Sequence, residues 1–313
     1  MHRHEREARP ADAGLRKLTP AWRGRLAIIG AAFIFGSTFV VVQDAVEDLT
    51  PTAFLAARFG IAAIVLIPFI RGSSPAPGVA QMGGPGVVVG GIAAGAVLGV
   101  GYLFQTAGLQ FTSATNSAFI TGLLVAFTPL LAAVFLHRRL TATTLAGVAV
   151  ALVGLFALTG GIDDFGRGDV LTVGCAVAFA GHVILLDVYA SRFGLVGFTA
   201  VQMAVVAIGS ALLVPFTGIG RLTPTAVAAI VFTGVFASAV AFWLQAFGQR
   251  FVGPSRTALL LLLEPVFAGI LGYLVGDRLG VGGVVGAVLI LAGTGLAEIG
   301  AMRRGVIPAP DST

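Results

Sequence analysis

Charge is scarce in this sequence. Asp, Glu, Lys and Arg make up 11% of the 313 residues, against about a quarter in an ordinary soluble domain. Hydrophobic residues account for 57%, and glycine occupies 44 positions. A chain this apolar has too little polar side-chain surface to face water on all sides. We therefore expect an integral membrane protein whose solvent and partner is the lipid bilayer.

Cysteine and catalytic motifs are also lacking. Cys175 is the single cysteine, which excludes a disulfide framework within one chain and a multi-cysteine metal site. The sequence contains no Gly-x4-Gly-Lys-Ser/Thr phosphate loop, no Gly-x-Ser-x-Gly and no His-Glu-x2-His motif. We predict that the chain is not an enzyme, holds no cofactor or metal, and does not hydrolyse ATP by itself.

Long apolar runs fill the rest of the chain. A run of roughly 20 residues crosses the hydrocarbon layer as a helix, because a helix satisfies its own backbone hydrogen bonds. An all-α integral membrane protein with ten transmembrane helices follows. The predicted spans are about 26–44, 52–70, 85–109, 114–136, 142–160, 170–190, 196–217, 224–248, 256–275 and 280–300.

The chain repeats itself. The segment Tyr102–Phe111 reappears as Phe242–Phe251, and an offset of 139 pairs Arg139-Leu140 with Arg278-Leu279. Each copy holds five spans, an odd number, so the second copy must enter the bilayer in the opposite orientation. Two inverted five-helix repeats are typical of secondary transporters. We predict a cytoplasmic basic tail at 1–25, repeats at 26–160 and 168–300, and a cytoplasmic C-terminal tail at 301–313.

The distribution of charge predicts the orientation. Lys and Arg gather in the N-terminal 25 residues and in alternate loops, whereas most acidic residues fall in the other loops. Since loops rich in Lys and Arg stay cytoplasmic, we expect a multi-pass protein of the cell (inner) membrane with both termini inside. The same rule accounts for the formal charge of +5, so nucleic-acid binding is not expected. The first apolar run lacks a cleavage pattern and is read as a retained span.

Several short motifs occur in a characteristic order. They are Phe33-Ile-Phe-Gly-Ser-Thr-Phe39, Phe54-Leu-Ala-Ala-Arg-Phe59, Thr112-Ser-Ala-Thr-Asn-Ser-Ala-Phe-Ile-Thr121, Glu264-Pro-Val-Phe-Ala268 and Gly276-Asp-Arg-Leu279. Together they resemble the drug/metabolite transporter (DMT) superfamily, specifically ten-helix permeases of the EamA family, from about Leu26 to Leu296. The resemblance implies export of small metabolites such as amino acids, or of drugs, across a bacterial-type inner membrane. One departure stands out: the family usually ends span 4 with Gly-Glu-Arg-Leu, and this chain has His137-Arg-Arg-Leu140.

Glu264 is the leading candidate for a functional side chain. A charge inside a span is costly and usually faces a cavity or a partner. Glu264 directly precedes Pro265, which has no N–H and weakens the helix there. An acid beside a helix break at Pro265 is able to bind a cation or accept a proton. The alternative is that Glu264 only satisfies freed backbone groups or a neighbouring helix.

Arg58 is the second charge inside a span, and an offset of 144 pairs it with Gln202 of the second repeat. One reading is that Arg58 extends outward along its own stem towards the interface. The other is that its guanidinium faces the cavity and holds a substrate carboxylate or an acid of the protein. Because Gln202 is an amide, the two halves of the cavity are expected to differ in charge.

His182 lies within a span, and an offset of 145 pairs it with Ser37 of the first repeat. Histidine titrates near neutral pH, so a proton relay or a substrate contact is one role. A hydrogen-bonded packing residue is the other.

Gln105 and Gln245 occupy equivalent places in spans 3 and 8, near Tyr102 and Trp243. The amides serve either as interhelical contacts or as donors lining a cavity, and the aromatics suit a pocket for an organic solute. Asn116 in span 4 leaves the same choice open.

These residues predict a secondary-active transporter of small organic solutes that works by alternating access. Its partners would be a small-molecule substrate and the bilayer, with protons and a homodimer as open questions. The alternatives are a channel-like facilitator, an importer or an integral-membrane enzyme. A channel predicts a continuous polar stripe, which the sequence does not contain.

Overall fold

A computed structural model of the protein describes residues 19–38, 41, 48–72, 85–112, 114–160, 165–274 and 280–302. The two predicted tails lie outside this range except for their residues nearest the membrane spans. Every regular element in the described part is helical, apart from one isolated bridge between Leu49 and Gly220. The elements are α2 (Pro20–Ser37), α4 (Pro51–Gly72), α5 (Pro85–Gly108), α6 (Ala114–Gly122), α7 (Leu124–Phe135), α8 (Ala142–Thr159), α9 (Arg167–Tyr189), α10 (Leu195–Thr217), α11 (Pro224–Phe232), the π-helix η1 (Thr233–Val240), α12 (Ala241–Val252), α13 (Pro254–Leu261), α14 (Leu263–Leu274) and α15 (Val281–Met302).

These elements form ten membrane-crossing segments in the described residues. Seven of them are single helices, namely α2, α4, α5, α8, α9, α10 and α15, which are spans 1, 2, 3, 5, 6, 7 and 10. Span 4 is α6 followed by α7, span 8 is α11 with η1 and α12, and span 9 is α13 followed by α14. Spans 2, 3, 4, 6, 7, 8 and 9 are long and apolar enough to cross a bilayer by themselves, spans 5 and 10 contain shorter apolar stretches, and the described part of span 1 is in neither group. The protein is thus an all-α integral membrane protein.

Span 1 begins earlier than predicted. The sequence indicates a start near Leu26, but α2 begins at Pro20 because Thr19 caps it by accepting a hydrogen bond from the Trp22 backbone N–H. Proline at the first helical position suits this start, since its missing N–H has no intrahelical partner there. The predicted end of span 1, near residue 44, lies outside the described residues.

The outer surface of the bundle is strongly apolar. Several large hydrophobic side chains are more than half exposed, including Ile64 (67%), Val134 (67%), Leu212 (68%) and Phe216 (86%). In water such a surface would drive aggregation, whereas in lipid it needs no partner.

The contact between spans 5 and 10 shows how the two repeats are related. A Cβ atom on Gly147 would lie 2.7 Å from the carbonyl oxygen of Gly293, and one on Gly154 would lie 2.8 Å from that of Gly286. The repeat offset pairs Gly147 with Gly286 and Gly154 with Gly293. Gly147 therefore contacts the equivalent of Gly154, and Gly154 contacts the equivalent of Gly147. The two helices run antiparallel. This is the contact pattern of a two-fold axis, as two inverted repeats require.

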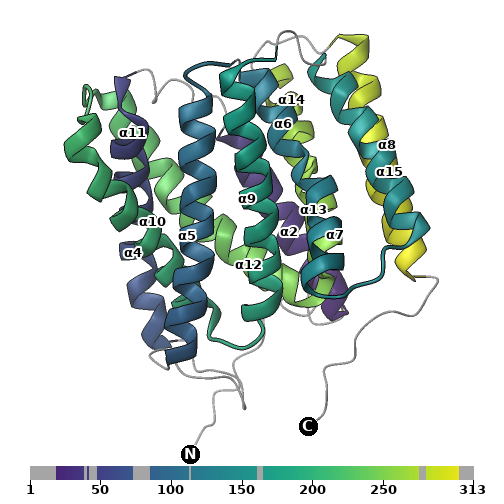
Figure 1. The fold of residues 1–313 in the computed structure, drawn as a ribbon, viewed down its shortest axis with the longest axis horizontal. Helices are drawn as coiled ribbons and strands as arrows, with labels where there is room; N and C mark the ends of the chain where they lie inside the picture. The colour runs from purple at the N-terminus through teal and green to yellow at the C-terminus, as the bar shows by residue number, and fades with distance from the viewer. Residues whose placement is uncertain are drawn as a thin grey trace, which may run out of the picture.

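The same symmetry organises the rest of the bundle. Spans 5 and 10 lie side by side at one edge, and spans 2 and 7 pack together towards the other (Figure 1). Between them, span 6 packs on span 3 as span 1 packs on span 8. The interrupted spans 4 and 9 pack against spans 6 and 1. Spans 1, 3, 4, 6, 8 and 9 thus form the middle of the molecule.

Candidate functional site

A cavity of about 110 Å³ lies between these six central spans. Both repeats contribute to its wall, which is aromatic and aliphatic with a few polar side chains. The aromatic members are Phe35, Tyr102, Phe179 and Phe242. The polar members are Gln105, Thr121, His182, Gln245 and Glu264. An apolar pocket with a few convergent polar groups is the usual form of a small-molecule site.

A break in span 9 brings Glu264 to the cavity. The helix stops at Leu261 and restarts at Leu263, with Leu262 between α13 and α14. Pro265 lies in the first turn of α14 and also lines the cavity. The break therefore comes before Pro265 and not at it, which corrects the predicted position. Because Pro265 has no N–H, a continuous helix would leave the Leu261 carbonyl without its partner.

Span 4 breaks at the equivalent place. Leu123 separates α6 from α7, and the repeat offset pairs Leu123 with Leu262. Ala126 stands where the second repeat has Pro265, so proline is not needed for this break. The sequence analysis missed it because a single glycine, Gly122 at the end of α6, does not by itself predict a break. The signal available was the alignment of the two repeats, which transfers the break from one to the other.

No described residue is bonded to the carboxylate of Glu264. Its side chain is partly exposed, and it lines the cavity. Among the described residues we find no hydrogen bond or ion pair to its carboxylate. The positive charge of Arg58 acts on it through space. The reading that Glu264 merely satisfies a neighbouring group is therefore not supported.

Arg58 is buried behind the wall of the cavity, with 3% of its surface exposed. Its Nε donates a hydrogen bond to the Ser238 hydroxyl at 2.7 Å, and its Nη2 donates to the Tyr102 hydroxyl at 3.4 Å. The guanidinium carbon lies 5.1 Å from the centre of the Tyr102 ring and 5.2 Å from that of Phe59. Arg58 thus neither reaches the membrane interface nor lines the cavity. Tyr102 lies between Arg58 and the cavity.

Ser238, the partner of Arg58, belongs to the π-helical stretch of span 8. π-helical turns are rare and often mark functional positions. A Cβ atom on Gly234, in the same stretch, would lie 2.9 Å from the Arg58 carbonyl oxygen. The backbone of span 8 therefore comes close to span 2, and only glycine fits there. Hydropathy alone gave no sign of this stretch.

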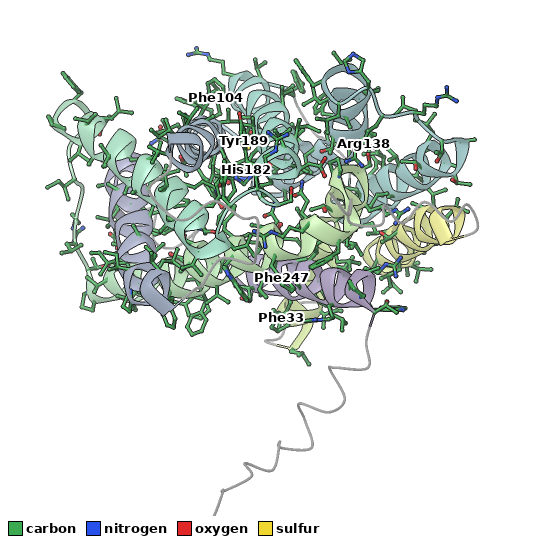
Figure 2. The ribbon with its side chains drawn as sticks, turned by 90° about the horizontal axis from the view of Figure 1, so that it is seen from below. Phe33, Phe104, Arg138, His182, Tyr189 and Phe247 are labelled. Atoms are coloured by element: carbon green, nitrogen blue, oxygen red, sulfur yellow. The ribbon has the colours of Figure 1, made fainter. Side chains whose placement is uncertain are left out.

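His182 and Gln202 form a hydrogen-bonded pair at 2.8 Å. The Gln202 amide nitrogen donates to the Phe198 carbonyl oxygen at 3.2 Å, so its Oε1 is the acceptor and His182 Nε2 is the donor. His182 lines the cavity, whereas Gln202 does not. In the view of Figure 2, His182 lies in the interior of the bundle and Phe33 lies at its periphery.

The two glutamines face the cavity from opposite repeats. Gln105 donates to the Thr121 hydroxyl at 3.2 Å, and both residues line the cavity. Gln245 is 3% exposed and lines the cavity as well. Among the described residues no hydrogen-bond partner of its amide is found.

Two other candidates lie elsewhere, and the side chain of a third is not described. Ser37 donates to the Ile34 carbonyl oxygen of its own helix at 2.7 Å, and Trp243 stacks on Phe247 with ring centres 5.7 Å apart. Neither of them lines the cavity. The side chain of Asn116 lies outside the described residues.

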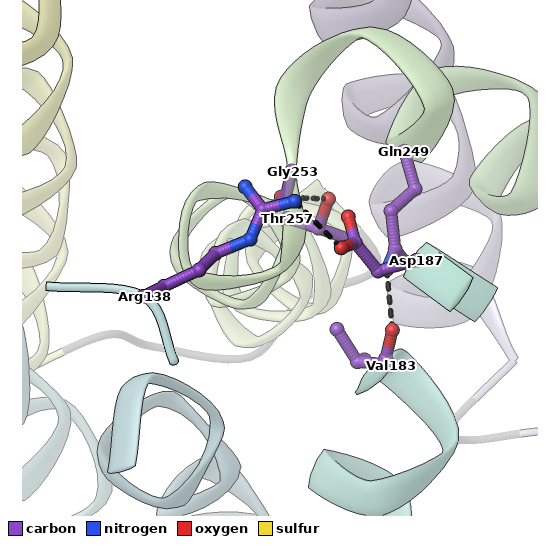
Figure 3. Close-up of polar contacts among 6 residues, drawn as sticks. All are labelled: Arg138, Val183, Asp187, Gln249, Gly253 and Thr257. Carbon is purple, nitrogen blue, oxygen red and sulfur yellow. Dashed lines mark hydrogen bonds and ion pairs between the residues drawn. The ribbon is translucent and has the colours of Figure 1, made fainter. Parts of the chain in front are cut away.

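Polar contacts also join the repeats at the two ends of span 6. At one end the Thr112 hydroxyl donates to Asp169 Oδ1 at 2.6 Å. At the other end Arg138 Nη2 and Asp187 Oδ2 form an ion pair at 2.8 Å (Figure 3). Thr112 precedes span 4 and Arg138 follows it, so span 6 holds both ends of span 4. Close to the ion pair, the Gln249 amide donates to the Val183 carbonyl oxygen (Figure 3).

The described residues contain no group of three or more His, Cys, Asp or Glu side chains that would hold a metal ion. What the cavity offers instead is one free carboxylate, amides and aromatic rings. Ten spans in two inverted repeats around such a cavity define the protein as a membrane permease.

Comparison with known proteins places this permease in a family. The chain matches the EamA-like transporter family twice, over residues 22–160 and again over residues 166–298. It belongs to that family, which is part of the drug/metabolite transporter superfamily. The protein is accordingly a membrane transporter, and its relatives point away from an enzyme.

The relatives carry little functional detail. An uncharacterized transporter from Archaeoglobus fulgidus is 32% identical over 238 residues, which cover 76% of this chain and 73% of that protein. The uncharacterized transporter YyaM from Bacillus subtilis is 29% identical over 290 residues, 88% of this chain and 93% of that protein. A solved crystal structure has the same fold, with a TM-score of 0.75 at 20% identity over 90% of this chain and 98% of its own.

Proposed function

We propose that the protein is a secondary-active transporter that moves small organic solutes through the 110 Å³ cavity by alternating access. The observation that carries this proposal is the free carboxylate of Glu264 in a cavity whose wall comes from both inverted repeats. When two such repeats rock against each other, a site between them opens to one side of the membrane at a time.

The contacts at the ends of span 6 fit this mechanism. Arg138–Asp187 and Thr112–Asp169 each join span 6 of the second repeat to a segment flanking span 4 of the first. Opening the cavity towards one side requires the contact on that side to separate. Arg138 is half exposed, so water is able to replace its lost partner at little cost, whereas separating the buried Asp169 from Thr112 costs more.

The orientation in this proposal follows the distribution of charge. With Arg23, Arg25, Arg138, Arg139 and Arg192 on one side and Asp48 and Asp169 on the other, the Arg138–Asp187 end is cytoplasmic. We place the protein in the cell (inner) membrane with both termini inside, and we propose export of amino acids, related metabolites or drugs. With no nucleotide motif in the sequence, the driving force comes from the solute gradient, protons or the membrane potential.

The test is a comparison of released metabolites. Wild-type protein, Glu264→Gln and Asp48→Asn are expressed at matched membrane levels, and metabolites are profiled in cells and medium. Asp48→Asn is the matched control, because Asp48 accepts from Thr223 at the bundle end, away from the cavity. We expect a compound released by wild type and Asp48→Asn but not by Glu264→Gln. Release equal to that of empty cells for all three proteins would contradict the export proposal.

A further inference from the structure

We propose that the cavity recognises its solute through a single ammonium group, which binds Glu264 between aromatic walls, and that it needs no carboxylate on the solute. This inference rests on the proposed transport function and narrows its substrate class to small organic amines.

The charges around the cavity favour a cation. Of the described residues that line it, Glu264 is the single carboxylate, and no Lys or Arg is among them. A carboxylate facing a cavity inside a bilayer is stabilised by a bound cation that replaces its lost hydration. No described residue forms a hydrogen bond or ion pair with the Glu264 carboxylate, and the charge of Arg58 acts on it only through space.

Arg58 is not available to hold a solute carboxylate. Its guanidinium already donates to Ser238 and Tyr102 and lies against the rings of Tyr102 and Phe59. Tyr102 lines the cavity, whereas Arg58 does not. A solute anion would have to displace Tyr102 to reach it. The described wall of the cavity therefore offers the Glu264 carboxylate to a solute cation and no guanidinium or ammonium group to a solute anion.

The walls suit an ammonium group. Phe35 and Phe242 meet edge to face with ring centres 5.2 Å apart, and Tyr102 and Phe179 do so at 5.1 Å. Aromatic faces attract cations, and the attraction grows where water is excluded. The amide of Gln245, which lacks a partner in the described part of the chain, supplies a carbonyl oxygen that accepts a second N–H of the ammonium.

The size of the cavity limits the solute. A volume of about 110 Å³ has room for several waters, each of which takes about 30 Å³ in the liquid. An amine with a short carbon chain fits this space, whereas a multi-ring drug does not fit without further opening.

Binding of three probes of similar length tests the proposal: n-butylamine, n-butyrate and 4-aminobutyrate. Full-length protein is purified in detergent, and Kd is obtained from the dependence of the thermal unfolding midpoint on probe concentration. We expect n-butylamine to bind at least as tightly as 4-aminobutyrate, and n-butyrate not to bind. Glu264→Gln should weaken n-butylamine binding by about 30-fold or more, as expected when one member of a buried charge pair is neutralised.

Three further variants separate recognition from folding. Glu264→Asp keeps the charge and should retain part of the affinity, Phe242→Leu should weaken n-butylamine binding by about two- to tenfold, and Asp48→Asn should leave it unchanged. Binding of n-butyrate, n-butylamine binding that is equal in wild type and Glu264→Gln, or no n-butylamine binding at all would each overturn the inference. If metabolite release still depends on Glu264 in those cases, the transport function stands and only the substrate class is wrong.

Discussion

Spans 4 and 9 occupy equivalent places in the two repeats and differ in one chemical respect. Both helices break at the equivalent residue, Leu123 in one and Leu262 in the other. Two residues further on, span 4 has a buried valine, Val125, whereas span 9 has Glu264 facing the cavity. The inverted repeats thus share the interrupted shape, while the ionisable group is present in only one of them.

Arg58 and Gln202 make the same point. Arg58 of the first repeat reaches across to Ser238 of the second, whereas Gln202 bonds to His182 of its own repeat. Symmetry of the backbone therefore gives a two-sided cavity, and substitutions on that backbone give the two sides different chemistry.

The largest effect is expected when an acid is introduced into the first repeat at the position equivalent to Glu264. Val125 is fully buried, so Val125→Glu places a carboxylate in the core without a partner. We expect the free energy of unfolding to fall by about 3–5 kcal/mol, measured by denaturation in detergent. Val125→Gln has nearly the same shape without the charge and serves as the control. Equal stability of the two variants would show that the first repeat accepts an acid at this position.

The next largest loss of stability is expected when Arg58 is replaced by glutamine, the residue at the equivalent position 202 of the second repeat. Arg58→Gln removes the donors to Ser238 and Tyr102, and hydrogen bonds from charged groups contribute about 1.5–3 kcal/mol each. Because a buried charge is removed as well, we expect a net loss of about 2 kcal/mol in unfolding free energy. Arg58→Lys keeps the charge but lacks the planar guanidinium fork, so its unfolding free energy should lie between those of the wild type and Arg58→Gln. A fully stable Arg58→Gln would mean that these contacts contribute nothing to the fold.

The two ends of span 6 offer a smaller test of alternating access. A reporter thiol is introduced by Ala258→Cys in a Cys175→Ala background, because Ala258 lines the cavity. Asp187→Asn should raise labelling by an impermeant thiol reagent from the cytoplasmic side by about two- to fivefold, as expected for an ion pair in which Arg138 is half exposed. Thr112→Val should raise labelling from the outer side instead. Labelling that rises from the same side of the membrane in both variants would contradict the proposal that each contact closes the cavity on its own side.

The smallest effect is expected at the proline. Pro265 lies in the first turn of α14, where a backbone N–H has no intrahelical partner in any case. Since span 4 breaks with Ala126 at this place, Pro265→Ala should leave span 9 interrupted and change stability by less than about 1 kcal/mol. Hydrogen exchange around Leu262 and solute transport measure the outcome. Strong protection of Leu262 in the variant would show that proline creates the break.

Several members of the candidate site were predictable from the sequence. Glu264, His182, Gln105 and Gln245 stand out as rare polar groups within apolar runs, and Tyr102 as an aromatic near Gln105; all five line the cavity. Polarity inside a membrane span is costly, so it marks side chains that face the interior of the bundle.

Other members were not predictable in this way. Phe35 and Phe179 line the cavity, but phenylalanine is equally at home against lipid, as the exposed Phe216 shows. Trp243 adjoins the cavity residue Phe242 in the sequence and nevertheless stacks on Phe247 outside the cavity. Which way an apolar side chain faces depends on the rotation of its helix, and hydropathy does not report that rotation.

The sequence by itself determined that the chain spans the membrane, that it does so ten times and that its halves are inverted repeats. These properties follow from the length of apolar runs and from a repeat with an odd number of spans, neither of which depends on packing. The tertiary structure alone decided that Arg58 is engaged by Ser238 and Tyr102, that no described residue bonds to the Glu264 carboxylate, and that Arg138 meets Asp187. Such pairings join residues far apart in the chain, and only the packing of helices on one another fixes which of them meet.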